Sequence, residues 1–184
     1  MVSTQVGKIY ACLNTLRSIA VDLPWKTKLQ LFKSFILTHF IFGDVFQLGM
    51  LAFESSKLEV ALNRCARFIF NLGARVSVRH LQKELLGCNF SNFYKLRCCI
   101  FLHRVMHRRE PRYLYCKLSR CRGLRTGNYL VPPHHSSNYG KSLFVRGVVV
   151  WNSLPTTIKL ETSEAMFKKG CINYFNSTES IGRI

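Results

Sequence analysis

The chain is 184 residues long and 48% hydrophobic, which is enough to bury the core of one domain of ordinary size. Its 27 lysines and arginines outnumber nine acidic residues, so the net charge is +18 at pH 7. Asp22 and Asp44 are the only aspartates, and neither lies beside another acid. Nucleotidyl transfer by two metal ions requires carboxylates that converge on those ions. The composition therefore argues against a polymerase or nuclease centre, and the chain alone is not expected to be an enzyme.

The eight cysteines do not indicate a secreted disulfide scaffold. The first residues, MVSTQVGKIYACLN, lack the continuous apolar run of a secretory signal peptide. Free thiols are typical of reducing compartments. The sequence therefore predicts an intracellular protein of the nucleus or cytoplasm.

Residues 22–43 predict a helix. Asp22 is a candidate cap, and Pro24 falls in the first turn, where a missing N–H costs little. Apolar residues then recur at helical spacing, which predicts a buried stripe. Its members are Trp25, Leu29, Phe32, Ile36 and Phe40.

Residues 35–53 imitate a membrane span, because this stretch of 19 residues carries one charge. That charge, Asp44, lies near the middle, where an ionised group is costly in lipid. A broken, buried hairpin centred on Gly43 and Asp44 is the preferred interpretation. A small membrane protein that uses residues 35–53 is the alternative.

Residues 56–73 predict a second helix. Ser56 and Glu59 form a capping box, and Gly73 offers a left-handed residue at the other end. An apolar stripe runs between them, while Arg64 and Arg67 fall on other faces. The stripe consists of Leu58, Leu62, Cys65, Ile69 and Leu72. Such a helix can pack its apolar face against a protein core and bind phosphate with the arginines on its other faces.

Two further helices are expected, over residues 78–86 and 92–109. Ser77 is a candidate cap for the first, Gly87 its stop, and Pro111 terminates the second. Phe93, Leu96, Ile100 and Val105 are candidate core residues of the second helix, with Lys95, Arg104 and Arg108 exposed.

Cysteines and histidines gather on this long helix, as Cys98, Cys99, His103 and His107. Structural zinc sites usually draw ligands from two elements and include a closely spaced cysteine pair. Cys116 and Cys121 are so spaced, but His134 and His135 reach them only across a loop. Buried cysteines are the preferred interpretation, and no metal or other cofactor is expected.

The pattern changes after Arg120. Residues 120–141 are rich in Gly and Pro, which predicts a basic, irregular connector. In the next segment Val148–Val150 suit a strand, whereas the spacing of Phe144, Val148 and Trp151 suits a helix, and both alternatives stay open. A last helix is expected from about Glu164 to Phe175. The predicted division is a helical domain (1–119), the connector (120–141) and a C-terminal segment (142–184).

Nearly all of the net charge lies in the middle of the chain. Residues 60–160 hold 18 lysines or arginines against Glu84 and Glu110, a net charge of +16. Such a band is typical of proteins that neutralise phosphates and release counterions. Tyr113 and Tyr115 are interleaved with arginines, either as stacking surfaces for unpaired bases or as core residues. The candidate nucleic-acid contacts are Arg64, Arg67, Arg104, Arg108, Arg120, Arg122 and Arg125.

Several short motifs follow one another along the chain in a distinctive order. These motifs are LNTLR (13–17), LNRCARFIF (62–70), EPRYL (110–114), LRTGNYLVPP (124–133), YGKSLFVRGVVVWNSLP (139–155) and SEAMFKK (163–169). In this order they resemble the region that follows the catalytic palm in reverse transcriptases of non-LTR (LINE-type) retrotransposons, especially the jockey-like elements. The most specific piece is the one containing Trp151, Asn152, Leu154 and Pro155.

The resemblance implies a mainly α fold, with a helical thumb-like bundle, a long irregular connector and a short C-terminal helical segment. It also implies binding of RNA or an RNA–DNA hybrid without sequence preference, beside a palm domain. Magnesium and RNA-directed DNA synthesis belong to that palm, whose Ala-Asp-Asp motif this chain lacks. The expected function is a truncated remnant that binds template and primer. The alternative is a non-functional or protein-interaction remnant.

Overall fold

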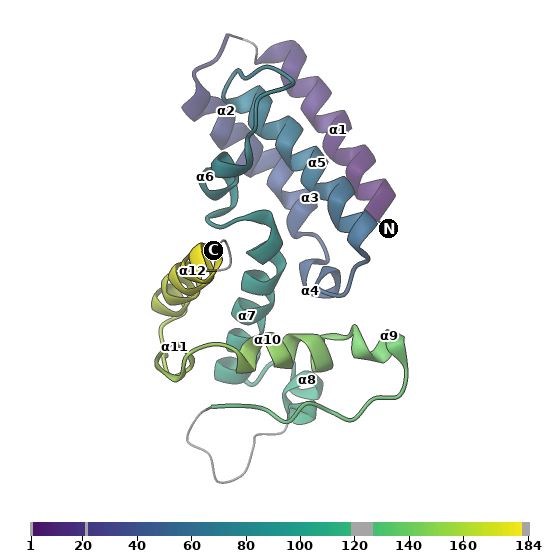
Figure 1. Ribbon diagram of the computed structural model, residues 1–184, viewed down its shortest axis with the longest axis vertical. Coiled ribbons are helices and arrows are strands. Elements are labelled where there is room, and N and C mark those ends of the chain that lie inside the picture. Colours follow the sequence, from purple (N-terminus) through teal and green to yellow (C-terminus); the bar gives the residue numbers. More distant parts are fainter. Residues whose placement is uncertain (1, 21, 119–126, 182–184) are drawn as a thin grey trace. The chain divides into compact units, whose positions relative to one another are not determined.

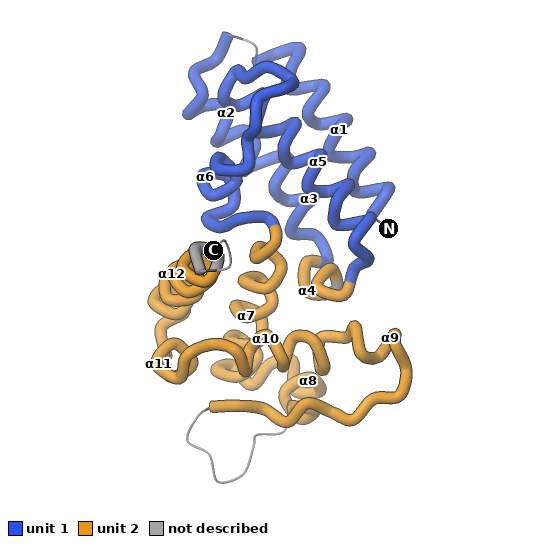
Figure 2. Tube along the Cα trace, in the orientation of Figure 1, with its two compact units in different colours: residues 1–43, 50–90 blue, residues 44–49, 91–184 orange. Residues whose placement is uncertain are grey.

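The computed structural model describes residues 2–20, 22–118 and 127–181. Within these ranges the chain is mainly helical, as the sequence predicted, and it has no strand (Figure 1). The chain forms two compact units (Figure 2). Unit 1 comprises residues 1–43 and 50–90, and unit 2 comprises residues 44–49 and 91–184. The contacts thus divide the chain near residue 90, whereas the predicted division placed boundaries at 119 and 141.

Unit 1 is a helical bundle. Helix α1 (Val2–Ile19) packs along α5 (Ala52–Ile69). A second segment, made of α2 (Trp25–Leu31), the π-helical turn η1 (Phe32–Ile36) and α3 (Leu37–Ile41), packs against these two helices. The short elements η2 (Arg79–Leu81) and α6 (Gln82–Leu86) follow α5. Fully buried core residues are Ile9, Leu13, Phe32, Ile36, Phe40, Leu58, Leu62 and Ile69.

The segment from α2 to α3 confirms the predicted helix and corrects its details. Residue Asp22 makes no cap, because Pro24 is the N-cap residue and its carbonyl accepts the first backbone hydrogen bonds. Trp25 was expected in the core but is 44% exposed, and its ring stacks on Phe70 with centroids 5.7 Å apart. At the very start of a helix a side chain faces fewer packing neighbours than one in the middle.

Helix α5 begins one turn earlier than predicted, at Ala52. The Leu51 N–H donates to the Glu54 carboxylate, while the Glu54 N–H donates to the Leu51 carbonyl. The Glu54 side chain thus caps the helix start before Ser56, so the predicted box of Ser56 and Glu59 is wrong. The Ser56 hydroxyl instead donates to the Ala52 carbonyl.

The end of α5 was also assigned to the wrong residue. Asn71, with φ 53°, takes the left-handed position that Gly73 was predicted to occupy. The Leu72 N–H then donates to the Arg67 carbonyl at 2.8 Å, which closes the helix end in a Schellman motif. Asparagine is the residue that most readily replaces glycine in this conformation.

Unit 2 is built around α7 (Phe90–Arg108). Its other helices are α4 (Asp44–Gln47), α8 (Arg112–Lys117), α9 (Ser137–Gly140), the π-turn η3 (Leu143–Gly147), α10 (Val148–Asn152), α11 (Thr156–Lys159) and α12 (Glu164–Ile181). Gly147 permits close packing on α7, since a Cβ there would lie 3.0 Å from the Cys98 sulfur. The core is formed by Phe93, Leu96, Cys98, Cys99, Ile100, Leu102, Val105, Val148, Trp151 and Phe167.

Several predicted helix boundaries after residue 77 are close to the observed ones. Helix α6 ends at Gly87, which is left-handed with φ 81°, although Ser77 makes no cap. Helix α7 begins two residues earlier than predicted and ends at Arg108. The segment around Val148 is helical, which resolves the choice between strand and helix. Helix α12 runs to Ile181, beyond the predicted end at Phe175.

Residues 35–53 are divided among η1, α3, α4 and α5. Gly43, with φ 68°, separates α3 from α4, so the predicted break at Gly43 and Asp44 is present. The Asp44 carboxylate pairs with the Arg97 guanidinium of α7. In the part of the chain that the structure describes, no helix has both the length and the apolar character needed to cross a membrane.

Candidate nucleic-acid interface

Two of the predicted nucleic-acid contacts, Arg64 and Arg67, lie on α5 in unit 1. The guanidinium of Arg64 lies 4.9 Å from the centre of the Tyr10 ring on α1, and its side chain is exposed. Arg67 is half-buried and donates from Nε and Nη2 to the Val76 carbonyl, at 3.3 and 3.1 Å. Arg67 therefore holds the segment after α5, whereas Arg64 rests on an aromatic face and presents its charge outward.

Two more predicted contacts, Arg104 and Arg108, lie one turn apart on α7 in unit 2. Arg104 Nε donates to Glu164 Oε1 at 2.9 Å, and Arg108 Nη2 lies 3.9 Å from Glu164 Oε2. The hydrogen bond from Arg104 lowers the pKa of Glu164 and raises that of Arg104. One carboxylate of α12 thus orients two arginines and cancels part of their charge.

Further basic residues follow Arg104 and Arg108 at the end of α7 and along α8. We call Arg104, Arg108, Arg109, Arg112, Tyr113 and Lys117 the α7–α8 basic surface, and all of its members are exposed. Tyr113 is 66% exposed. Tyr115 is half-buried beneath Arg109, whose guanidinium lies 5.9 Å from the ring centre. The two tyrosines therefore differ: Tyr113 is largely exposed, and Tyr115 supports an arginine.

The remaining predicted contacts, Arg120, Arg122 and Arg125, lie outside the described residues. Among the cations that are described, the α7–α8 basic surface is the densest group along the chain. It places five basic residues between positions 104 and 117, with Glu110 as the single acid in that range.

The motif at residues 151–155 makes structural contacts. Trp151 stacks on Phe167 with centroids 5.5 Å apart and donates from Nε1 to the Gly127 carbonyl at 3.0 Å. The Asn152 amide exchanges two hydrogen bonds with the backbone of Tyr129, at 3.0 and 2.8 Å. Leu154 is buried and Pro155 precedes α11. Trp151 and Asn152 thus bind the backbone of Gly127 and Tyr129, and they hold this part of the predicted connector against the core of unit 2.

The Cys and His residues of α7 are mostly buried. Burial raises the pKa of Cys98 to about 12 and raises that of Cys99 well above its ordinary value, so neither is an activated nucleophile at neutral pH. His103 is also buried, whereas His107 is exposed. Among the described residues, no three Cys, His, Asp or Glu side chains are grouped closely enough to hold a metal ion.

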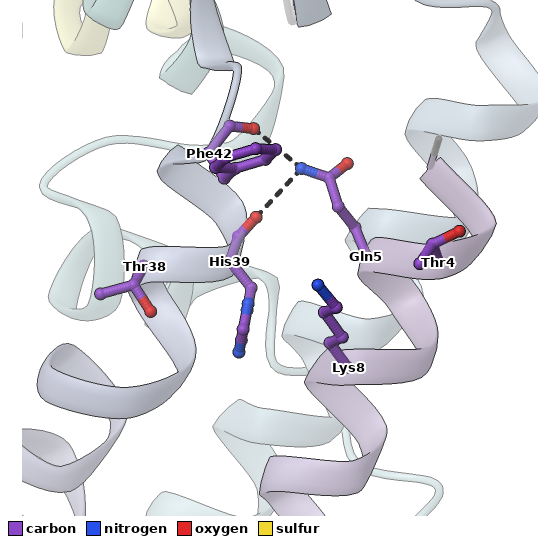
Figure 3. A pocket seen from close by; sticks show the side chains of 6 residues that line it. All are labelled: Thr4, Gln5, Lys8, Thr38, His39 and Phe42. Carbon is purple, nitrogen blue, oxygen red and sulfur yellow. Dashed lines mark hydrogen bonds between the residues drawn. The ribbon is translucent and has the colours of Figure 1, made fainter.

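A cavity in unit 1 was not predicted from the sequence. It has a volume of about 460 Å³ and is lined by Thr4, Gln5 and Lys8 of α1 with Thr38, His39 and Phe42 at the end of α3 (Figure 3). Gln5 Nε2 donates to the carbonyls of His39 and Phe42, at 3.2 and 2.8 Å. More than 30 residues separate the two walls along the chain, so no local sequence pattern brings them together.

Comparisons with models of known protein families, with curated proteins and with solved structures found no match for this chain. The assignment of a function therefore rests on the chain's own residues, their exposure and their charges.

Proposed function

We propose that this chain is a remnant of a non-LTR retrotransposon reverse transcriptase, comprising its thumb and connector, and that it binds RNA or an RNA–DNA hybrid without sequence preference. The observation that supports binding most directly is the α7–α8 basic surface, where residues 104–117 carry five exposed cations and the exposed ring of Tyr113. The order of the sequence motifs supports the origin.

The chemistry of the surface suits a nucleic-acid backbone. Each phosphate that an arginine or lysine neutralises releases condensed counterions, which favours binding at low salt. A guanidinium also donates two parallel hydrogen bonds to one phosphate, and Glu164 holds that of Arg104 in a fixed orientation. Tyr113 adds a face on which an unpaired base can stack, independently of base identity.

Binding, rather than synthesis, is the activity proposed. In the family, magnesium and the polymerase reaction belong to the palm, and the palm is the protein partner expected beside this region. The chain contributes positively charged helices that hold the template and primer.

The test compares binding of an RNA–DNA hybrid by two double variants at one low salt concentration. Arg108→Gln with Arg112→Gln removes two charges from the α7–α8 basic surface and should weaken binding about tenfold or more. Lys168→Gln with Lys169→Gln removes two exposed charges from α12 and should have a much smaller effect. Equal losses in the two variants would show that net charge alone, and not this surface, attracts the nucleic acid.

Exposed apolar side chains favour a second candidate, a protein-interaction remnant. Phe42, Leu51 and Phe53 are 69%, 47% and 57% exposed. A palm domain would cover such residues in a complete enzyme, and without it they favour self-association. Sedimentation over a range of protein concentrations tests this candidate, since a monomer at every concentration would argue against it.

A further inference from the structure

The cavity between α1 and α3 is separate from the proposed nucleic-acid interface, since none of its lining residues belongs to the α7–α8 basic surface. Its walls are fixed to each other. The buried Gln5 side chain uses its amide group to hold the last carbonyls of α3, as Figure 3 shows. A site of this kind is largely formed before a ligand arrives, which reduces the entropy lost on binding.

The charges of the residues that line the cavity favour an anionic ligand. None of the lining residues is Asp or Glu. Lys8 forms no ion pair or hydrogen bond with any described residue, and in Figure 3 its side chain and that of His39 extend into the same space. His39 Nε2 lies 3.6 Å from the Cys12 sulfur, while Nδ1 has no hydrogen-bond partner among the described residues. One ammonium group and one ring nitrogen are therefore available to an anionic group.

The remaining lining residues indicate which other chemical groups the anionic ligand contains. Phe42 presents a ring that is 69% exposed, which suits a flat aromatic group. The Thr38 hydroxyl donates to the Phe35 carbonyl, so towards a ligand it can act only as an acceptor, as a sugar hydroxyl requires. The volume of about 460 Å³ falls within the range of about 300–1,000 Å³ that is usual for small-molecule sites.

We propose that this cavity binds a nucleoside monophosphate. The phosphate lies against Lys8 and His39, the base against the ring of Phe42, and a ribose hydroxyl donates to Thr38. The site does not depend on the proposed function, because it recognises a single nucleotide and uses different residues.

The test is calorimetric titration of the full chain with AMP, adenosine and inorganic phosphate. AMP is expected to bind saturably at a single site, and adenosine and phosphate are each expected to bind about tenfold more weakly or worse. Absence of saturable AMP binding would overturn the proposal. So would adenosine or phosphate binding as tightly as AMP, because one half of the site would then have no role.

Matched variants locate the site. Lys8→Met should weaken AMP binding about tenfold, and because Lys8 is exposed and pairs with none of the described residues, the unfolding temperature should not change. Lys33→Met removes the same charge from an exposed position of η1 outside the cavity and should leave AMP binding unchanged. Arg108→Gln with Arg112→Gln should also leave it unchanged, although this variant weakens hybrid binding. Unaltered AMP binding by Lys8→Met, or an equal loss in Lys33→Met, would refute the assignment.

Discussion

His103 is a buried ionisable residue whose environment favours its neutral form. Its ring stacks on Phe167 with centroids 4.2 Å apart, and its Nε2 lies 2.8 Å from the Glu161 carbonyl, to which it donates a hydrogen bond. Burial lowers the pKa of His103 below its ordinary value of 6.5. The native chain therefore takes up this proton less readily than the unfolded chain, so its stability falls as the pH drops below 6.5.

This pH dependence can be measured by urea unfolding at about pH 7.5 and about pH 5.5. The free energy of unfolding of the wild type should be lower at the acidic pH. In His103→Gln, whose amide can still donate to Glu161 but does not titrate, the difference between the two pH values should shrink. His80→Gln, an exposed histidine of unit 1, serves as the control. An unchanged difference in His103→Gln would show that other groups cause the pH dependence.

Glu164 cancels part of the charge of the α7–α8 basic surface, because its carboxylate pairs with Arg104 and Arg108. Its carboxylate stays ionised at neutral pH, because the hydrogen bond from Arg104 lowers its pKa. Glu164→Gln should strengthen binding of an RNA–DNA hybrid and steepen its salt dependence, by about one unit of slope at most. Filter binding at several salt concentrations measures both quantities. Weaker binding by this variant would mean that orienting Arg104 matters more than the charge it cancels.

At the scale of elements, the contacts of Asn152 join α10 to residues far away in the sequence. Its amide group satisfies both the N–H and the carbonyl of Tyr129. Lys159, which precedes α12, adds hydrogen bonds from its Nζ to the Asn152 carbonyl and to Asn128 Oδ1, at 2.8 and 2.7 Å. These bonds fix the path of the chain at Asn128 and Tyr129, which lie within the predicted connector.

Asn152→Ala should therefore destabilise unit 2 by about 1–3 kcal/mol, because the replacement leaves two backbone groups of Tyr129 without these partners. Asn138→Ala in α9 is the matched control, since its side chain is exposed and makes no hydrogen bond to the described residues; its effect should stay within about 0.5 kcal/mol. Both free energies come from denaturant unfolding. A loss in Asn152→Ala as small as that of the control would mean that these hydrogen bonds do not stabilise the fold.

Elements marked by local signals were the ones that the sequence predicted well. Gly87 ends α6 and the apolar spacing on α7 matches its buried face, because both effects arise within a few residues. The start of α5 was missed because the Glu54 carboxylate, which lies before the predicted box, accepts the Leu51 N–H and caps the helix earlier. The partners of Arg104 and Gln5 were also missed, since Glu164 and Phe42 are 60 and 37 residues away. Side-chain pairing over such separations depends on the tertiary fold.

At the scale of the whole molecule, the two units do not follow the order of the chain. Residues 44–49 lie between two segments of unit 1 but belong to unit 2. Asp44 pairs with Arg97, and Arg146 donates to the Leu48 carbonyl at 3.2 Å. The segment that resembles a membrane span in the sequence is therefore interrupted by residues that pack with α7 and η3. Its one charge has a partner of opposite sign.

We propose that the positive middle of the chain binds nucleic-acid phosphates, and such binding must depend on the salt concentration. The affinity of the full chain for an RNA–DNA hybrid should fall steeply as salt rises, and hybrids of unrelated sequence should give the same slope. Arg108→Gln with Arg112→Gln should reduce the slope by about 0.7–0.9 for each phosphate that the variant no longer neutralises. A flat salt response, or no binding at low salt, would show that these positive residues do not bind nucleic-acid phosphates.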